Sequence, residues 1–236
     1  MRGLGMYYND PSIILVLIGA LLCLITSGMV KSTFNRYSKV MSSSGLTGAQ
    51  VAAQILKSKG IYDAKVEQVS GSLTDHFNPA TKVVSLSETV YGSTSVSAIS
   101  VAAHECGHAI QHDEDYFPLR IRSTILPVAN FGSKYGLWIV IAGLILSFLR
   151  PLVFIGVLLF AFGVVFQLAT LPVEFDASRR ALEVISEMGI LGDGEMEGAK
   201  KVLKSAAMTY VASAAASILS LLRLILIAQG GRSRRD

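Results

Sequence analysis

The sequence predicts a mainly α-helical integral membrane protein, with three or four transmembrane helices and a small α+β part outside the bilayer. Hydrophobic residues make up 51% of the 236 residues, and charged residues only 16%, against about 25% in typical soluble domains. The mean hydropathy is +0.51, and the apolar residues cluster in long charge-free runs. This composition argues against a soluble enzyme and excludes a disordered chain, an ordinary nucleic-acid-binding domain and a small disulfide-linked domain.

The first membrane span is predicted at residues 12–30, within an N-terminal segment 1–30. The run has no charged residue and is long enough to cross a hydrocarbon core of about 30 Å. The alternative is a secretory signal peptide. Lys31 to Lys39 follow the run where such a peptide would have a small-residue cleavage site, so we expect the span to be retained.

Two further charge-free runs, residues 135–149 and 152–173, predict a transmembrane hairpin over residues 135–173. The first run is short, and it lengthens backwards if the Lys134 side chain reaches the interface. Arg150 and Pro151 lie between the two runs, where a helix interior would not favour proline. The sequence therefore predicts a very tight connection.

A fourth apolar run covers residues 205–222 and continues beyond Arg223, so residues 205–236 are predicted to form an apolar helix with a basic tail. The first half of the run is rich in Ala and Ser, a composition that suits helix packing as well as lipid contact. The sequence leaves open whether this helix crosses the bilayer.

Lys and Arg residues near the spans predict the orientation of the chain. One basic residue, Arg2, precedes the first span, whereas Lys31, Arg36 and Lys39 follow it. The positive-inside rule then places the N-terminus outside and residues 31–134 in the cytoplasm. We therefore expect a multi-pass protein of the cell membrane.

The predicted hairpin returns residues 174–204 to the cytoplasm, and the basic residues of that segment agree with this placement. A fourth crossing would carry the tail outside, against the same rule. The basic residues of the tail are Arg232, Arg234 and Arg235.

Outside the spans, the pattern is that of an α+β unit. Residues 45–59 are amphipathic, with Thr47 placed to cap a helix and Gly60 after its end. Residues 94–112 are again helical in pattern, and another helical stretch runs from Glu174 to about Met188 before a loop.

Short strands are predicted within residues 65–86, because KVEQVS and TKVVSLS alternate in polarity. Residues 75–81 contain Asn78–Pro79, which is typical of a turn.

Residues 104–108, which read HECGH, are the strongest candidate site. His104 and His108 are four residues apart and face the same side of a helix, where two imidazoles can bind one zinc ion. Glu105 lies beside them and can reach a water on the metal. The spacing is the HExxH pattern of metalloprotease zinc sites. The alternative is two surface histidines, but the chain has only four histidines in all.

A catalytic zinc ion keeps three protein ligands and one open position, so one Zn²⁺ per chain needs a third ligand. A third histidine one turn further, His112, would lie too far along the helix axis. An acidic pair directly after a span, Glu174 and Asp176, needs a partner, and a metal ion is such a partner. The alternative is a cap for a helix that follows Pro172. The candidates are His76, His112, Glu174 and Asp176.

Two motifs, HECGH and EFDASRRA, separated by a hairpin of spans, resemble those of the HtpX and CAAX prenyl protease type of membrane zinc metallopeptidase. More specifically, the chain is similar to the YugP-type neutral zinc metallopeptidases, a bacterial membrane family, along most of its length from residue 30. The stretches that carry this similarity are LTDHFNPATKVVSLS, AAHECGHAIQ, PVANFGS, PVEFDAS and EGAKKVL with MTYVA.

The resemblance implies a zincin-like cytoplasmic metallopeptidase part with a gluzincin-like site. It implies His104, His108 and Glu174 as zinc ligands and Glu105 as the residue that acts on the water. The chain departs from the HtpX-type motif at Ser178, where that family has Asp. Because serine cannot supply the charge that supports a ligand histidine there, the candidates for this role are Asp176, Glu88 and Asp75.

The function this predicts is a membrane-anchored zinc-dependent endopeptidase. Zinc lowers the pKa of its water toward about 7, and Glu105 takes a proton from that water as the general base. A further donor should stabilise the oxyanion. His76 is of most interest because a peptide substrate can add to a strand edge beside it. The candidate donors are His76, Tyr91, Tyr116, Arg179 and Arg180.

Two alternatives remain, an intramembrane protease of the site-2 type and a non-catalytic membrane scaffold with a structural metal. The helix before HECGH is only weakly apolar and the chain has no LDG motif, which argues against the first. A structural site has no use for Glu105, which argues against the second.

The expected partners are the lipid bilayer and a peptide or protein substrate, membrane proteins among them, but no nucleic acid. The sequence does not predict an oligomeric state.

Overall fold

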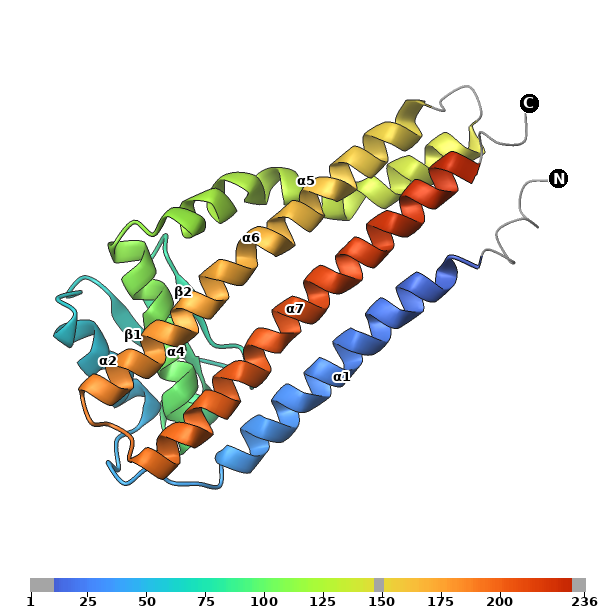
Figure 1. Cartoon of the computed structure of the whole chain (residues 1–236). Coiled ribbons are helices and arrows are strands. Elements are labelled where there is room, and N and C mark those ends of the chain that lie inside the picture. Colours follow the sequence, from blue (N-terminus) through green and yellow to red (C-terminus); the bar gives the residue numbers. More distant parts are fainter. Residues whose placement is uncertain (1–10, 147–150, 231–236) are drawn as a thin grey trace. The chain divides into compact units, whose positions relative to one another are not determined.

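The computed structural model describes residues 11–146 and 151–230, and it is mostly helical with one small sheet (Figure 1). The predictions that concern Arg2, the turn at Arg150 and the basic tail from Arg232 lie outside these residues. The elements are α1 (Ile13–Tyr37), α2 (Gly48–Ser58), β1 (Lys65–Val69), β2 (His76–Asn78), β3 (Val83–Ser87), α3 (Glu88–Tyr91), α4 (Val96–Asp113), α5 (Phe117–Ile145), α6 (Pro151–Glu187) and α7 (Asp193–Gly230).

The chain divides into two compact units, and each is described by itself. An apolar unit comprises Met1–Ile25, Ile121–Leu171 and Tyr210–Asp236. An α+β unit comprises Thr26–Arg120 and Pro172–Thr209. Long helices contribute to both units, because α1, α5, α6 and α7 each continue across a division point.

Four helices of the described chain, α1, α5, α6 and α7, are long and apolar enough to cross a membrane. This finding confirms a mainly helical chain with up to four candidate spans. The fourth predicted run lies in α7, which meets the same criteria of length and composition. Whether α7 crosses the bilayer stays a prediction.

Small residues let α5 and α6 approach closely within the apolar unit. A Cβ added to Gly132 would overlap the backbone of Leu159, and one added to Gly156 would overlap the backbone of Gly136. Such small-residue contacts are typical of helices that pack in membranes, where backbones gain van der Waals contact by close approach. The predicted hairpin of residues 135–173 therefore corresponds to a tightly packed helix pair.

Both hairpin helices extend beyond the predicted apolar runs. α5 begins at Phe117, well before Tyr135, and contains Pro127. One of its basic residues, Arg122, has a partner within the apolar unit, since its guanidinium lies 5.9 Å from the centre of the Phe166 ring. The charge-free run in the sequence therefore marks only the most apolar part of α5, and the helix itself is longer.

The predicted helix boundary at Pro172 is wrong, because α6 is continuous from Pro151 to Glu187 with Pro172 inside it. A proline removes one backbone donor from a helix, but the rest of the helix keeps its hydrogen bonds, and Pro172 lies on the exposed side. Val173 and Ala177 beside it are fully buried, so packing holds the helix through this point. Glu174 thus lies in a helix interior and not at a helix start.

The α+β unit begins with a helix whose ends follow the sequence signals. Thr47 and Gln50 form a reciprocal capping box at the start of α2. Gly60, just after its end, has φ +76°, a backbone conformation that glycine adopts without steric cost. The predicted amphipathic helix at residues 45–59 is confirmed in α2.

The three strands form one sheet in the order β1-β3-β2. β1 is parallel to β3, with Lys65 opposite Val83, and β2 is antiparallel to β3, with His76 opposite Ser85. The two predicted strands are confirmed as β1 and β3. The turn indicated by Asn78–Pro79 is confirmed, because a turn begins at Pro79, and residues 76–78 just before it form a further strand that pairs with β3.

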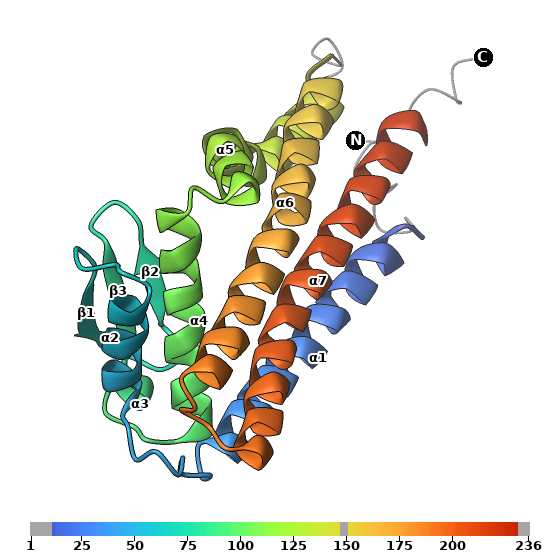
Figure 2. The same cartoon turned by 60° about the vertical axis from the view of Figure 1, so that its left-hand side comes forward.

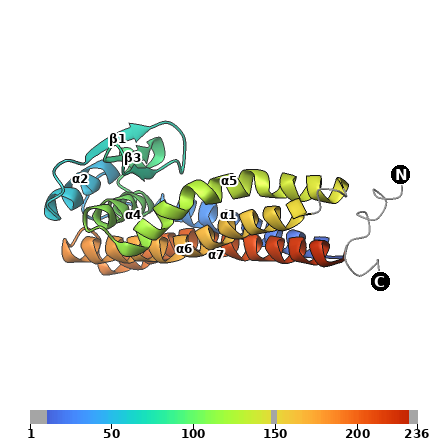
Figure 3. The ribbon, with the colours of Figure 1, turned by 90° about the horizontal axis from the view of Figure 1, so that it is seen from above.

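Within the α+β unit, α4 lies between the sheet with α2 on one side and the C-terminal part of α6 on the other (Figures 2 and 3). The core between these elements is closely packed and aliphatic. Its fully buried side chains include Val51, Ile55, Leu86, Ile99 and Ile185. The helix that carries HECGH is therefore held on both faces.

Candidate metal centre

The helix α4 presents the two histidines of HECGH on one face. Ser95 caps its start by accepting a hydrogen bond from the Ala98 amide at 3.3 Å. The rings of His104 and His108 stand edge to face, with centroids 4.8 Å apart. Both side chains are largely buried. The four-residue spacing thus produces the shared face that the sequence predicts.

Gly107 brings α6 close enough to supply a third donor. A Cβ at Gly107 would overlap the carbonyl group of Ala177 on α6. No larger residue fits between the two helices at this point, so their backbones are in direct contact. Glu174 lies one turn before Ala177 on α6 and is 3% exposed.

The distances from Glu174 to the two histidines match those between ligands of a tetrahedral zinc site. Glu174 Oε2 lies 3.4 Å from His104 Nε2 and 3.5 Å from His108 Nε2, and the three residues offer ligand atoms that all lie within 4.8 Å of one another. Ligands bound at about 2.0–2.2 Å in a tetrahedron are roughly 3.3–3.6 Å apart. Two imidazoles and one carboxylate are also a donor set of catalytic zinc sites, so these residues fit the ion.

Gln111 orients His108, a role that sequence reasoning missed. Its Nε2 donates to the Val173 carbonyl at 2.8 Å and to Asp176 Oδ2 at 2.9 Å. The amide oxygen therefore faces His108 Nδ1, 3.1 Å away, and can only accept. Nδ1 carries the proton, so in the neutral ring the Nε2 lone pair points to Glu174 Oε2. Two lone pairs this close repel each other, and either a proton on Nε2 or a metal ion between the two atoms removes the repulsion.

Ser178 contacts the Nδ1 atom of His104, as Gln111 contacts the Nδ1 atom of His108. Its Oγ lies 3.2 Å from His104 Nδ1. The sequence assigned this supporting role to Asp176, Glu88 or Asp75 because a serine carries no charge. The structure instead places the neutral hydroxyl of Ser178 on the ring, and a hydrogen bond there still fixes the ring orientation.

Asp176 lies beside the centre and belongs to a polar network. Its carboxylate accepts from Arg180 Nε at 2.5 Å, from Arg179 and from Gln111. Arg180 continues the network to Glu114, 2.6 Å away. Asp176 therefore supports His108 through Gln111 and is not among the three grouped donors.

Glu105 is buried next to the donors, with 7% of its surface exposed. Among the residues that the structure describes, none forms a hydrogen bond or an ion pair with its carboxylate. Burial raises the pKa of Glu105, the charges of His104 and His108 oppose this, and the charge of Asp75 adds to the rise. The carboxylate is thus held beside the imidazoles and is not used by a protein partner.

The other predicted site residues lie elsewhere. His112 contacts the Phe77 ring, with centroids 5.8 Å apart, and Asp75 accepts hydrogen bonds from the Ser87 amide and hydroxyl at 2.7 and 3.0 Å. His76 is exposed on β2, with Nδ1 2.9 Å from the Thr74 carbonyl. Neither histidine belongs to the group of three donors.

The candidate oxyanion donors and the cysteine in HECGH are also engaged with other groups. Arg179 is about half exposed and pairs with Asp176 and Glu183. The ring of Tyr116 lies under Arg180. Tyr91 lines a separate groove of about 510 Å³ beside α2. The Cys106 thiol donates to the Ala52 carbonyl at 3.6 Å, away from the donor face.

Comparison with known proteins identifies the family of the chain. Residues 12–229 match a family described as "Putative neutral zinc metallopeptidase". The chain is 50% identical over 203 residues to a Bacillus subtilis (strain 168) protein named "Putative membrane protease YugP", over 86% of this chain and 90% of that protein. No solved structure matches the chain.

Proposed function

Because the chain belongs to the neutral zinc metallopeptidase family, we propose that it is a membrane-anchored zinc-dependent endopeptidase. The observation that carries this proposal is the convergence of His104, His108 and Glu174 from α4 and α6, with Glu174 Oε2 at a tetrahedral ligand separation from both imidazole nitrogens. Three protein donors leave a fourth position open, as in catalytic zinc sites, whereas structural sites use four. We assign one Zn²⁺ to these three ligands.

Zinc held there would supply Lewis acidity, which acidifies a water molecule and polarises a carbonyl group. Glu105 accepts the proton of the attacking water as general base. The same carboxyl then delivers this proton to the leaving amide nitrogen. Its burial supports this assignment, as does the lack of a hydrogen bond or ion pair between its carboxylate and the described residues.

The sheet edge formed by β2 is the proposed place for a peptide substrate. β2 is an outer strand in the order β1-β3-β2, and it contacts the HECGH helix through Phe77 and His112. An extended peptide can add to such an edge by main-chain hydrogen bonds. This arrangement would present a peptide bond beside α4 and leave exposed His76 to contact the substrate.

Two observations weigh against the alternatives. α4 is not among the helices that meet the criteria for a membrane span, whereas a site-2-type protease carries HExxH inside such a helix. A scaffold with a structural metal would not need the unengaged carboxylate of Glu105. We therefore place the active site outside the bilayer, in the α+β unit.

We infer a multi-pass position in the cell membrane with the active site facing the cytoplasm. The four long apolar helices and the printed name of the B. subtilis relative support the membrane. The basic residues after the first span support the side. The peptidase part would then combine residues 31–134 with residues 174–204, and the substrate would be a peptide or a protein, membrane proteins included.

The proposal is tested by Glu105→Gln in the purified full-length chain, with Glu67→Gln on the exposed face of β1 as the matched control. We expect Glu105→Gln to retain one zinc ion and to lose peptidase activity by at least about a hundredfold, since a general base contributes roughly 10²–10⁴-fold. A chelator should abolish the activity of the wild type and of Glu67→Gln. Near-normal hydrolysis by Glu105→Gln would contradict the assigned mechanism.

A further inference from the structure

A second cavity of the α+β unit lies between α1 and α7 and is lined by basic side chains. It has a volume of about 260 Å³. Arg36 comes from α1, and Lys201 and Lys204 come from α7. No acidic residue lines the cavity, so its charge favours an anion.

The three basic groups are available to a ligand. In the described part of the chain, no carboxylate forms a salt bridge with Arg36 or Lys204, and Lys201 has a partner in Glu197 at 3.4 Å. Both members of that pair are more than half exposed, and exposed pairs of this kind contribute about 0–1 kcal/mol. Lys201 can therefore turn toward an anion at little cost.

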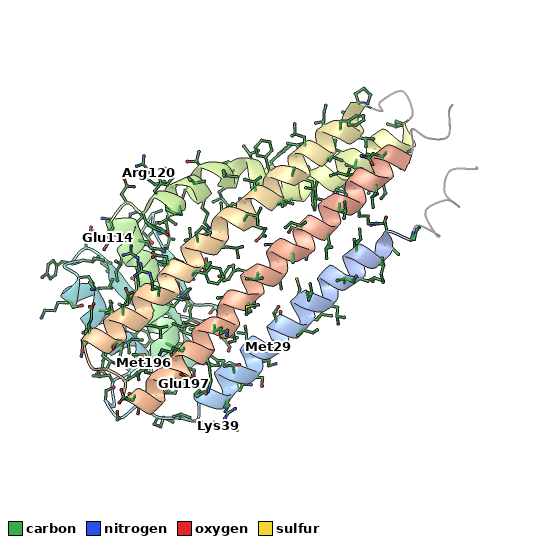
Figure 4. The ribbon with its side chains drawn as sticks, in the orientation of Figure 1. Met29, Lys39, Glu114, Arg120, Met196 and Glu197 are labelled. Carbon is green, nitrogen blue, oxygen red and sulfur yellow. The ribbon has the colours of Figure 1, made fainter. Side chains whose placement is uncertain are left out.

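The cavity is apolar at one end and basic at the other. Met29 and Met208 line one end, and Arg36 and Lys201 line the opposite end. Met29 lies on α1 beside α7 (Figure 4). Seven residues separate the two ends on each helix, which at 1.5 Å per residue is about 10 Å.

The apolar and basic ends of the cavity correspond to apolar and basic segments in the sequences of α1 and α7. The apolar end of α1 continues the charge-free run of residues 12–30, and the apolar end of α7 leads into the run of residues 205–222. The hydroxyl groups of Thr33 and Ser205 lie between the two ends, where they add polar groups next to the basic ones. A ligand that matches this lining has an anionic head and an apolar body.

We propose that this cavity binds the phosphate headgroup of an anionic glycerophospholipid, with the acyl chains directed toward the methionine end. Basic pockets between membrane helices are suited to anionic headgroups. The volume lies just below the range of about 300–1,000 Å³ of pockets for drug-sized ligands. It therefore suits a headgroup and not a whole lipid. This lipid site does not depend on the proposed peptidase activity.

The test measures lipid binding to the delipidated full-length chain in a neutral detergent, by native mass spectrometry. The variant Arg36→Gln/Lys204→Gln removes two of the cavity's charges. The control Lys31→Gln/Lys200→Gln removes the same charge from exposed positions of the same helices that do not line the cavity. Circular dichroism verifies that both variants fold.

We expect the wild type and the control to bind one phosphatidylglycerol more tightly than phosphatidylcholine. The cavity variant should lose roughly tenfold or more of that affinity, because each basic residue near an anionic lipid surface contributes several-fold. Equal losses in the cavity and control variants would overturn the proposal, since binding would then reflect overall charge. Full displacement of the lipid by inorganic phosphate would also overturn it, since the cavity would then be a site for the free anion.

Discussion

Gln111 links the two helices of the metal centre through a single buried side chain. It is fully buried, holds its amide oxygen 3.1 Å from His108 Nδ1 as a hydrogen-bond acceptor, and donates to the backbone of Val173 and to Asp176 on α6. The amide therefore fixes both the tautomer of a ligand and the position of the neighbouring helix. Groups that hold a ligand histidine in this way affect metal affinity without touching the metal.

We predict that Gln111→Leu weakens zinc binding by about 10–100-fold, the usual effect of losing a hydrogen-bond partner of a ligand. The measurement is zinc affinity by competition with a chelating dye. Gln68→Leu, on exposed β1, is the control and should bind zinc as the wild type does. Unchanged affinity in Gln111→Leu would show that His108 does not depend on this amide.

At the scale of single residues, the sequence predicts a site residue where its spacing alone places it on a known face of a helix. His104 and His108 share a helix face because they are four residues apart, and the group of three donors includes both. The role of Gln111 could not be predicted, because it depends on the approach of Val173 and Asp176 from a distant part of the chain. Ser178 was set aside for lack of charge, yet its hydroxyl reaches His104 Nδ1.

The contact of α4 with α6 is the element-scale feature on which the centre depends. Gly107 has no side chain to separate the helices from Ala177, and α6 passes through Pro172 without a break. The continuous helix fixes the position of Glu174 relative to Ala177. The donors of the centre can meet only if both conditions hold.

We predict that Gly107→Ala weakens zinc binding and lowers the free energy of unfolding by about 1–3 kcal/mol, as overpacked substitutions do. A Cβ at this position would meet the Ala177 backbone, which cannot move aside as a flexible side chain can. Gly92→Ala is the control, because its Cβ would meet no atom within 4 Å. The measurements are zinc affinity by titration and stability by thermal unfolding. Equal zinc affinity and equal stability of the two variants would contradict the packing argument.

The limits of helix prediction at this scale have physical causes. The capping residues of α2 are local, so Thr47 and Gln50 are readable from sequence. The helix through Pro172 is not, because tertiary packing outweighs the loss of one backbone donor. Residues 76–78 pair with β3, but three residues are too few to show the alternating pattern that predicts β1 and β3 from the sequence.

At the scale of the whole molecule, the proposed mechanism requires residues 31–134 and 174–204 to lie on the same side of the membrane. The metal donors come from both segments, so opposite sides would separate them. The orientation itself rests on the positions of Lys and Arg near the spans. The sequence predicts this sidedness, but composition alone does not decide whether α7 crosses.

We predict that cysteines introduced by Tyr62→Cys and Gly194→Cys, in a Cys23→Ser background, stay unlabelled by an impermeant maleimide until cells are permeabilised. Both positions are exposed, and the remaining Cys106 is buried. Labelling of both from outside would reverse the orientation but keep the shared side. Labelling of one alone would contradict the metal centre as assigned.

The central claim, that Glu174 completes the zinc site, is tested most directly by the zinc content of purified Glu174→Ala and Asp176→Ala after mild dialysis. The side chain of Glu174 lies 3.4–3.5 Å from both imidazoles, whereas that of Asp176 is bound by Arg179, Arg180 and Gln111. We predict that Glu174→Ala loses its zinc, while Asp176→Ala keeps most of the metal and loses only part of its activity. An empty Asp176→Ala beside a loaded Glu174→Ala would contradict the account.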